Sequence, residues 1–176
     1  LVVRAMISAA KADSEVGDQI EGLGRWLEAQ GAQVAWHRRP DFDADELWHT
    51  YVTMLRATTS VHMDEAGFGA VLAQAAGLDP QRRDYAALQY TGAGIRHRDW
   101  LQLQQKRAAF ATSWQRFFAE FDVLLCPAAV TTAFPIDESG EPWQRTLAVN
   151  GGTLVAVLLA LPAASGVALM RALPWA

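Results

Sequence analysis

The only cysteine of the chain, Cys126, follows a short apolar run, residues 123–125, and directly precedes Pro127. A thiol at a strand end could act as a nucleophile if a neighbouring histidine or helix N-terminus lowered its pKa. The sequence identifies neither beside Cys126, and single cysteines are most often small buried hydrophobic residues. A cysteine-dependent enzyme is therefore one hypothesis, and a buried, inert thiol is the favoured interpretation.

Histidines and serines offer weaker signals. His62 and Glu65 stand three residues apart in a segment that reads as a helix, so they could share one face and bind a metal ion. One such pair is a weak signal, and a solvated helix face explains it better. The serines are isolated from one another, and none lies in a Gly-x-Ser-x-Gly pattern. The sequence predicts no metal site and no cofactor.

The loop after the cysteine is the best candidate for binding. Pro127 ends the apolar run, and Phe134-Pro135-Ile136 then forms a stiff apolar stretch. In α/β proteins, binding groups gather where strands end. We expect Cys126, Pro127 and Phe134 to line a substrate pocket, and we assign no catalytic residue.

The elements that would position this loop begin with a strand, a helix and a second strand. Residues 2–7 and 33–36 are mostly apolar and partly β-branched, as in strands. Between them, Asp13 opens a segment whose apolar residues recur every three or four positions, and Gly31 is suited to cap its end. This order is typical of a parallel βαβ unit.

Helices dominate the next part of the chain. Residues 40–43 read as a turn and N-cap, and a helix follows them. A second helix is predicted over residues 63–76, and residues 77–94 read as a surface connection because they contain glycines, a proline and several charges. Asp99 is then expected to cap the longest helix, and residues 121–126 to form the strand that ends at Pro127.

These elements predict the α/β class, with a mixed sheet flanked by helices. These three strands and a fourth in the apolar run after residue 153, beside so many helices, would leave a sheet edge bare, so we expect an incomplete part of a larger domain. Residues 1–176 would form a single α/β segment of that domain. An aromatic row would seat the long helix on the sheet: Trp114, Phe117, Phe118 and Phe121.

Composition narrows the function classes. Of the 176 residues, 51% are hydrophobic and 19% charged, which excludes a disordered chain. The net charge of −4 and the absence of large Lys/Arg clusters argue against a nucleic-acid partner. A single cysteine excludes an internal disulfide and favours a reducing compartment, so we expect a cytoplasmic protein.

The uncharged run at residues 153–170 is long enough to suggest a membrane span. Pro162 lies in its middle, and small residues are frequent within it. A buried helix, a turn and a buried strand are the favoured interpretation, so no membrane partner is expected.

Several motifs resemble the C-terminal part of the amidase-signature hydrolases. The strongest match covers residues 107–137, where an aromatic-studded helix precedes "FDVLLCP" and "AFPID". Residues 145–151, "RTLAVNG", are similar to a motif that often follows in that family, and Leu161-Pro162-Ala163 is similar to its "LPA". The opening unit, with "LEAQGAQV" at residues 27–34, is also similar to the family pattern.

This resemblance implies hydrolysis of a carboxamide to an acid and an amine through a Ser–Ser–Lys triad, without a metal. No triad residue can be transferred, because Lys11 and Lys106 lie outside the family's lysine context and the Gly/Ser-rich segment is absent. The chain would therefore supply core and pocket wall and would be inactive alone. A family member would act on a small amide, and a homodimer is left open.

The alternative is a non-catalytic α/β binding or subunit module. Such a module would fold alone and recruit a partner through its exposed sheet edge.

Overall fold

The computed structural model describes residues 12–141 and 144–155. The chain divides into two compact units. We call Phe42–Thr112 the helical unit, and Leu1–Asp41 with Ser113–Ala176 the hairpin unit.

The helical unit is built from helices joined by short loops. Its elements are α2 (Ala44–Thr59), the 3-10 turn η1 (Ser60–His62), α3 (Glu65–Ala76), α4 (Tyr85–Ala93) and the first part of α5 (His97–Glu120).

Aspartates begin three of these helices. The carboxylate of Asp43 accepts hydrogen bonds from the backbone N–H groups of Asp45 and Glu46, at 2.8 and 3.1 Å. Asp64 and Asp84 play the same part for α3 and α4. Each cap satisfies N–H groups that have no partner inside the helix and contributes about 1 kcal/mol. The prediction of an N-cap at residues 40–43 is confirmed.

The core of the helical unit lies between α2 and α4. Val52 is 1% exposed and Trp48 6% exposed. The Trp48 ring stacks on that of Tyr85, with 6.1 Å between centroids and 14° between planes. Further along, a Cβ added to Gly92 would lie 3.0 Å from the carbonyl oxygen of Thr53, so the helix backbones approach closely there.

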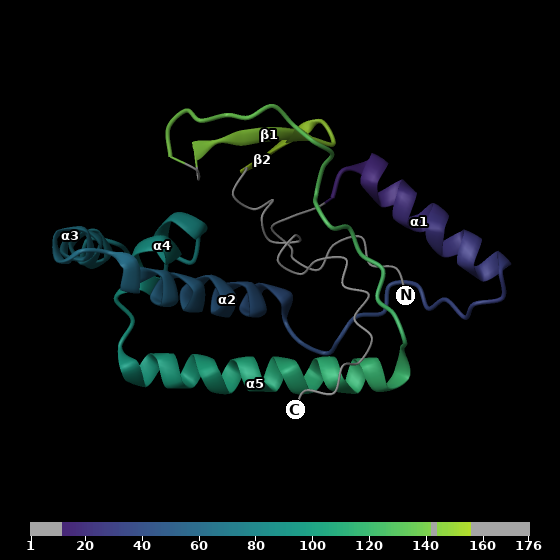
Figure 1. Cartoon of the computed structure of the whole chain (residues 1–176), viewed down its shortest axis with the longest axis horizontal. Helices are drawn as coiled ribbons and strands as arrows, with labels where there is room; N and C mark the ends of the chain where they lie inside the picture. Colours follow the sequence, from purple (N-terminus) through teal and green to yellow (C-terminus); the bar gives the residue numbers. More distant parts are fainter. Residues whose placement is uncertain (1–11, 142–143, 156–176) are drawn as a thin grey trace. The chain divides into compact units, whose positions relative to one another are not determined.

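Helix α5 lies beside α2 within the helical unit and runs the opposite way (Figure 1). Phe42 meets Phe110 edge-on at 5.5 Å, and the ammonium of Lys106 contacts the carboxylate of Glu46. Lys106 precedes Phe110 in the sequence, whereas its partner Glu46 follows Phe42. The two segments therefore run antiparallel.

The described part of the hairpin unit contains α1 (Ser14–Ala29), the end of α5 and two short strands. Asp13 caps α1 and accepts from the N–H of Glu15. At the other end Gly31 has φ +91°, and its N–H donates to the carbonyl of Glu28 at 2.9 Å. A positive φ is where glycine is favoured at a helix end, so the predicted cap at Gly31 is confirmed.

The strands β1 (Thr146–Val149) and β2 (Gly152–Val155) form an antiparallel hairpin. Val149 pairs with Gly152, which leaves a two-residue turn at Asn150 and Gly151. Both turn residues have positive φ, 52° and 74°. Asn-Gly is the preferred sequence for such a turn, because its twist matches that of the strands.

The predicted α/β fold with a mixed sheet flanked by helices is wrong for the described residues. Their only sheet is the two-stranded hairpin, and helices make up most of the rest. Residues 33–36 and 121–126, read as strands, are irregular apart from single-residue bridges at Trp36 and Leu125. Their apolar side chains pack against the end of α5, and a short apolar run does not by itself distinguish a strand from other buried chain. The strand predicted at residues 2–7 lies outside the described residues.

The surface connection predicted over residues 77–94 is also wrong. It contains α4, which contributes Ala87 and Leu88 to the core. Predicted boundaries elsewhere shift by a few residues: the helix expected at 63–76 is Glu65–Ala76, and the longest helix begins at His97 rather than at an Asp99 cap. Most of the apolar run at 153–170 lies outside the described residues.

Candidate functional site

The segment that carries Cys126 lies against the C-terminal turns of α5. Phe117 is buried and forms the centre of a cluster, with 4.8 Å between its ring centroid and that of Phe121. The residues packed on it are Ala35, Trp114, Phe118, Phe121, Leu124 and Cys126. The aromatic row is therefore core, as predicted, but it packs against irregular chain instead of a sheet.

This environment makes Cys126 a poor nucleophile. Burial raises the pKa of its thiol, because the charged thiolate is less well solvated among apolar side chains. A catalytic cysteine needs the opposite shift. The contacts are those of a small hydrophobic residue that fills space beside Phe117.

The other two residues predicted to line a pocket differ in exposure. Pro127 is buried, whereas Phe134 is 46% exposed. Between them Val130 is buried, and its carbonyl accepts from the N–H of Asp13 at 2.6 Å. This bond holds the loop against the start of α1. The pocket wall itself stays a prediction.

Arg145 fixes the chain that leads from this loop into β1. Its guanidinium donates to the carbonyls of Ser139 and Gly140, at 3.0 and 3.1 Å. Asp137 closes the same turn by accepting from the N–H and hydroxyl of Ser139, which lowers the pKa of its carboxyl group. The arginine of the "RTLAVNG" motif thus has a structural role.

Asn150 of the same motif joins the hairpin to α1. Its side-chain oxygen accepts from the N–H of Ser14 at 2.7 Å, and its amide nitrogen donates to the carbonyl of Ala12 at 3.0 Å. Both polar atoms of the side chain therefore bind backbone. No hairpin was predicted at residues 146–155, although Asn-Gly at positions 150 and 151 is a signal for one.

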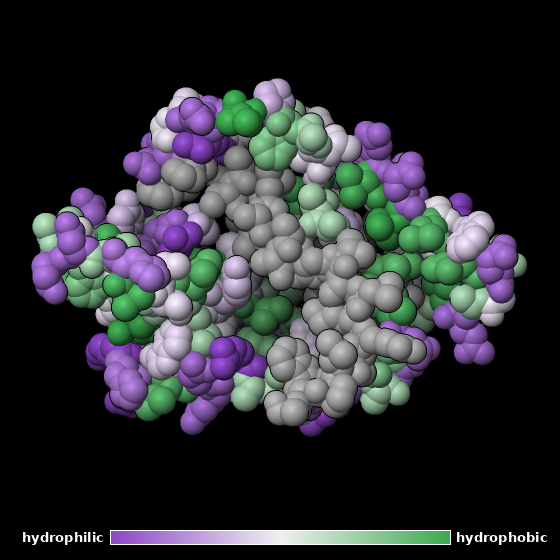
Figure 2. Space-filling model, viewed as in Figure 1, coloured by the Kyte–Doolittle hydropathy of each residue, from purple (hydrophilic) through white to green (hydrophobic). Residues whose placement is uncertain are grey.

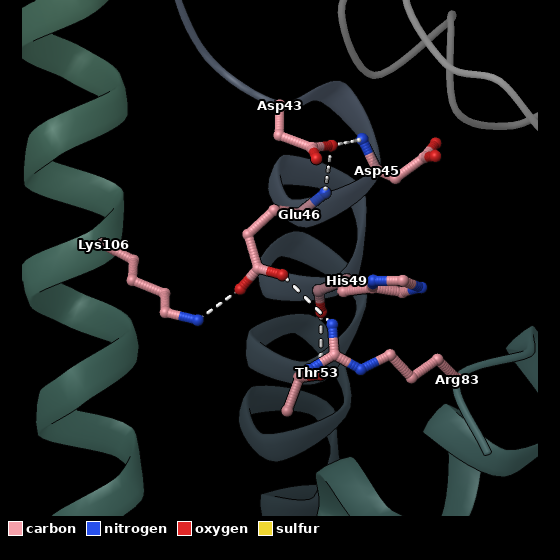
Figure 3. A network of polar contacts seen from close by, with 7 residues as sticks. All are labelled: Asp43, Asp45, Glu46, His49, Thr53, Arg83 and Lys106. Atoms are coloured by element: carbon pink, nitrogen blue, oxygen red, sulfur yellow. Dashed lines mark hydrogen bonds and ion pairs between the residues drawn. The ribbon is translucent and has the colours of Figure 1, made fainter. Parts of the chain in front are cut away.

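A polar network occupies the helical unit (Figure 3). Glu46 on α2 accepts from Lys106 on α5 and from Arg83 in the loop before α4, with 3.1 Å to Arg83. The hydrogen bond from Lys106 is the main cause that lowers the pKa of Glu46, and Arg83 adds to it. Residues 37 and 60 positions away thus meet one carboxylate, which no local sequence signal indicates. The network joins α2 to α5 and to the loop before α4. Both of its cations, Lys106 and Arg83, are paired with Glu46.

Glu46→Gln should lower the free energy of unfolding by about 0.5–1 kcal/mol at neutral pH, a value reduced by the partial exposure of the ion pair. The folded-state pKa of Glu46 is lowered, so its stabilisation is present above the unfolded pKa and is lost as pH falls through the folded pKa. Urea unfolding of both proteins between about pH 7 and pH 3 should show the gap closing below about pH 4. Glu120→Gln, which alters the more exposed pair with Arg38, is the control and should change little. A gap that persists in acid would contradict the ionic account.

His62 and Glu65 do not share a helix. His62 ends η1, whereas Glu65 is the first residue of α3, after the cap Asp64. Among residues 12–141 and 144–155, no group of three or more His, Cys, Asp or Glu side chains is placed to hold a metal ion.

Within the same described ranges, no helix combines the length and apolar character that crossing a bilayer requires. The sequence matches no model of a known protein family, and it matches no curated protein.

Proposed function

We propose that this chain is a non-catalytic part of a carboxamide hydrolase similar to the amidase-signature enzymes. It supplies helical core and, around Pro127 and Phe134, one wall of the amide pocket. The whole enzyme hydrolyses a small carboxamide to an acid and an amine in the cytoplasm and uses no metal or cofactor.

The observation that carries this proposal is the ordered series of motifs between residues 107 and 151. Residues of these motifs have defined structural partners, which supports the proposal. Arg145 binds the carbonyls that follow "AFPID", and Asn150 binds the start of α1. Cys126 packs on the aromatic end of the long helix.

The chemistry of the described side chains supports a non-catalytic role. Lys106 donates to the carboxylate of Glu46, a contact that joins α5 to α2. The thiol of Cys126 is disfavoured as a thiolate. Ser113 donates to the carbonyl of Asp41, as a structural hydroxyl does.

A second candidate, a binding or subunit module, is favoured by exposed apolar side chains near α3. Val61 is 75% exposed, and Met63 and Leu72 are also exposed. Hydrophobic residues are visible at the surface among hydrophilic ones in Figure 2. A non-catalytic subunit could cover such side chains with a partner. The predicted route through a sheet edge finds no support, because the described sheet is only the hairpin.

A fluorophosphonate probe, which forms a covalent bond with activated serines, tests the proposal on the native gene product and on this chain alone. We expect the native product to exceed 19.2 kDa and to carry the label on a serine outside residues 1–176. The chain alone should remain unlabelled and release no ammonia from simple carboxamides.

Three outcomes would contradict the proposal. An unlabelled native product of 19.2 kDa would favour the binding module. Amide turnover by the isolated chain that survives Cys126→Ala would place a catalytic group within residues 1–176. Turnover that Cys126→Ala abolishes, together with rapid labelling of the thiol by iodoacetamide, would establish a cysteine enzyme.

A further inference from the structure

Asn150 is the only asparagine in the chain, and Gly151 follows it. An asparagine side chain is open to attack by the backbone nitrogen of the next residue, and glycine hinders this attack least because it has no side chain. Asn150 is exposed and lies in a two-residue turn. Asn150 therefore has both the neighbouring residue and the exposure that favour deamidation.

The hydrogen bonds of Asn150 oppose the same reaction. Its side-chain oxygen is held by Ser14 and its nitrogen by Ala12, residues that lie 136 and 138 positions away in the sequence. Attack requires the side-chain carbonyl carbon to turn toward the nitrogen of Gly151, and both hydrogen bonds must break for that rotation. We call this pair of hydrogen bonds the Asn150 latch.

We propose that Asn150 is a site of spontaneous deamidation and that the Asn150 latch restrains the reaction in the folded chain. Hydroxide removes the proton from the nitrogen of Gly151, which bonds to the side-chain carbonyl carbon of Asn150. The bond from that carbon to the amide nitrogen breaks, and ammonia leaves with a proton from water. Water then opens the cyclic imide to aspartate or isoaspartate, and nothing is oxidised or reduced.

Neither product rebuilds the latch. A carboxylate at position 150 cannot donate to the carbonyl of Ala12 and places negative charge against its oxygen. Isoaspartate also adds one carbon to the main chain inside the turn, so the pairing of Val149 with Gly152 cannot keep its register. Aspartate can still accept from the N–H of Ser14 but cannot restore the bond to Ala12, so deamidation breaks the latch irreversibly.

Ser14→Pro tests the latch without touching the reacting residues. Ser14 is the first residue of α1, where proline is well tolerated, and Asp13 has φ −55° and ψ 146°, which suit a residue before proline. The substitution removes the N–H that binds Asn150. Ser14→Ala retains that N–H and is the matched control.

Both variants and the original chain are incubated at mildly alkaline pH, with and without urea, and digested with trypsin. Mass spectrometry follows the peptide that begins at Thr146, where any asparagine deamidation belongs to position 150. Two hydrogen bonds of ordinary strength should hold the open form to about a tenth of the population or less, so the folded chain should react at least about tenfold more slowly than the urea-unfolded chain. Folded Ser14→Pro should react severalfold faster than folded Ser14→Ala, and all three should converge in urea.

Equal rates for the two folded variants would overturn the role of the latch. A folded rate equal to the unfolded rate would also overturn the role of the latch. The absence of a mass change in urea would show that Asn150 is not a deamidation site. Circular dichroism of the two variants before incubation separates faster reaction through an open latch from loss of folding.

Discussion

Trp48→Ala should lower the free energy of unfolding of the helical unit by about 3–5 kcal/mol. The side chain of Trp48 is only 6% exposed. Its truncation to alanine therefore leaves a cavity inside the folded protein, and little of the surrounding surface becomes accessible to water. The indole also stacks on Tyr51 and Tyr85, with 6.2 and 6.1 Å between ring centroids. Loss of both stacked contacts adds to the loss of buried apolar area.

Trp26→Ala is the matched control, because Trp26 on α1 is 58% exposed. The same chemical change should cost less than about 0.5 kcal/mol there. Urea unfolding followed by far-UV circular dichroism gives both values, and hydrogen exchange at α2 and α4 assigns the Trp48 effect to the helical unit. If Trp48→Ala fails to fold, Trp48→Phe should still fold with a smaller loss. Equal costs at the two positions would contradict the packing described for α2 and α4.

The sequence was most informative where one residue fixes a local hydrogen bond or a backbone angle. Asp13 and Asp43 predicted helix starts because an aspartate can accept the first free N–H groups of a helix. Gly31 predicted a helix end for a similarly local reason, its access to positive φ. These predictions needed no knowledge of the rest of the chain.

Sequence interpretation failed where distant contacts decide the structure. Residues 33–36 and 121–126 have the composition of strands, but whether a strand forms depends on a partner elsewhere in the chain. Here the neighbour is the aromatic end of α5, and Phe117 buries side chains such as Ala35 and Leu124 without a sheet.

In the candidate site too, local features could be predicted from the sequence and contacts between distant residues could not. The apolar character around Cys126 predicted a buried thiol, and burial does raise the pKa of that thiol. The contact between Glu46 and Lys106 spans 60 residues and depends on how α2 and α5 pack, so the sequence could not predict it. Asn150 was noticed as part of a motif, yet its partners at residues 12 and 14 required the fold.

Gly92 explains why α4 was not predicted from the sequence, and its substitution is expected to change the free energy of unfolding. A glycine near the end of residues 77–94 reads as a helix breaker, because it lowers helix propensity by about 1 kcal/mol relative to alanine. In the structure it lies inside α4 and is buried. An added Cβ would lie 2.9 Å from the Cβ of Arg56 and 3.0 Å from the carbonyl oxygen of Thr53. The close approach of two helices therefore outweighs local propensity at this position.

Gly92→Ala should lower the free energy of unfolding of the helical unit by about 1–2 kcal/mol. Overpacking of this kind costs about 1–3 kcal/mol, and the better helix propensity of alanine offsets part of it. The cost is hard to avoid because the carbonyl of Thr53 belongs to the backbone and cannot rotate away as a side chain could. Relief requires α4 to move away from α2, which loosens the contacts of Ala87 and Leu88 as well.

Gly69→Ala makes the same change in α3 with the opposite expected sign. No atom lies within 4 Å of a Cβ added at Gly69, so the substitution meets no steric resistance. It should raise the free energy of unfolding by about 0.5–1 kcal/mol through helix propensity alone. Urea unfolding of the two variants and the original chain measures both effects. Stabilisation by both alanines would mean that α2 and α4 do not approach at Gly92, whereas opposite signs would establish the close crossing that forms the core of the helical unit.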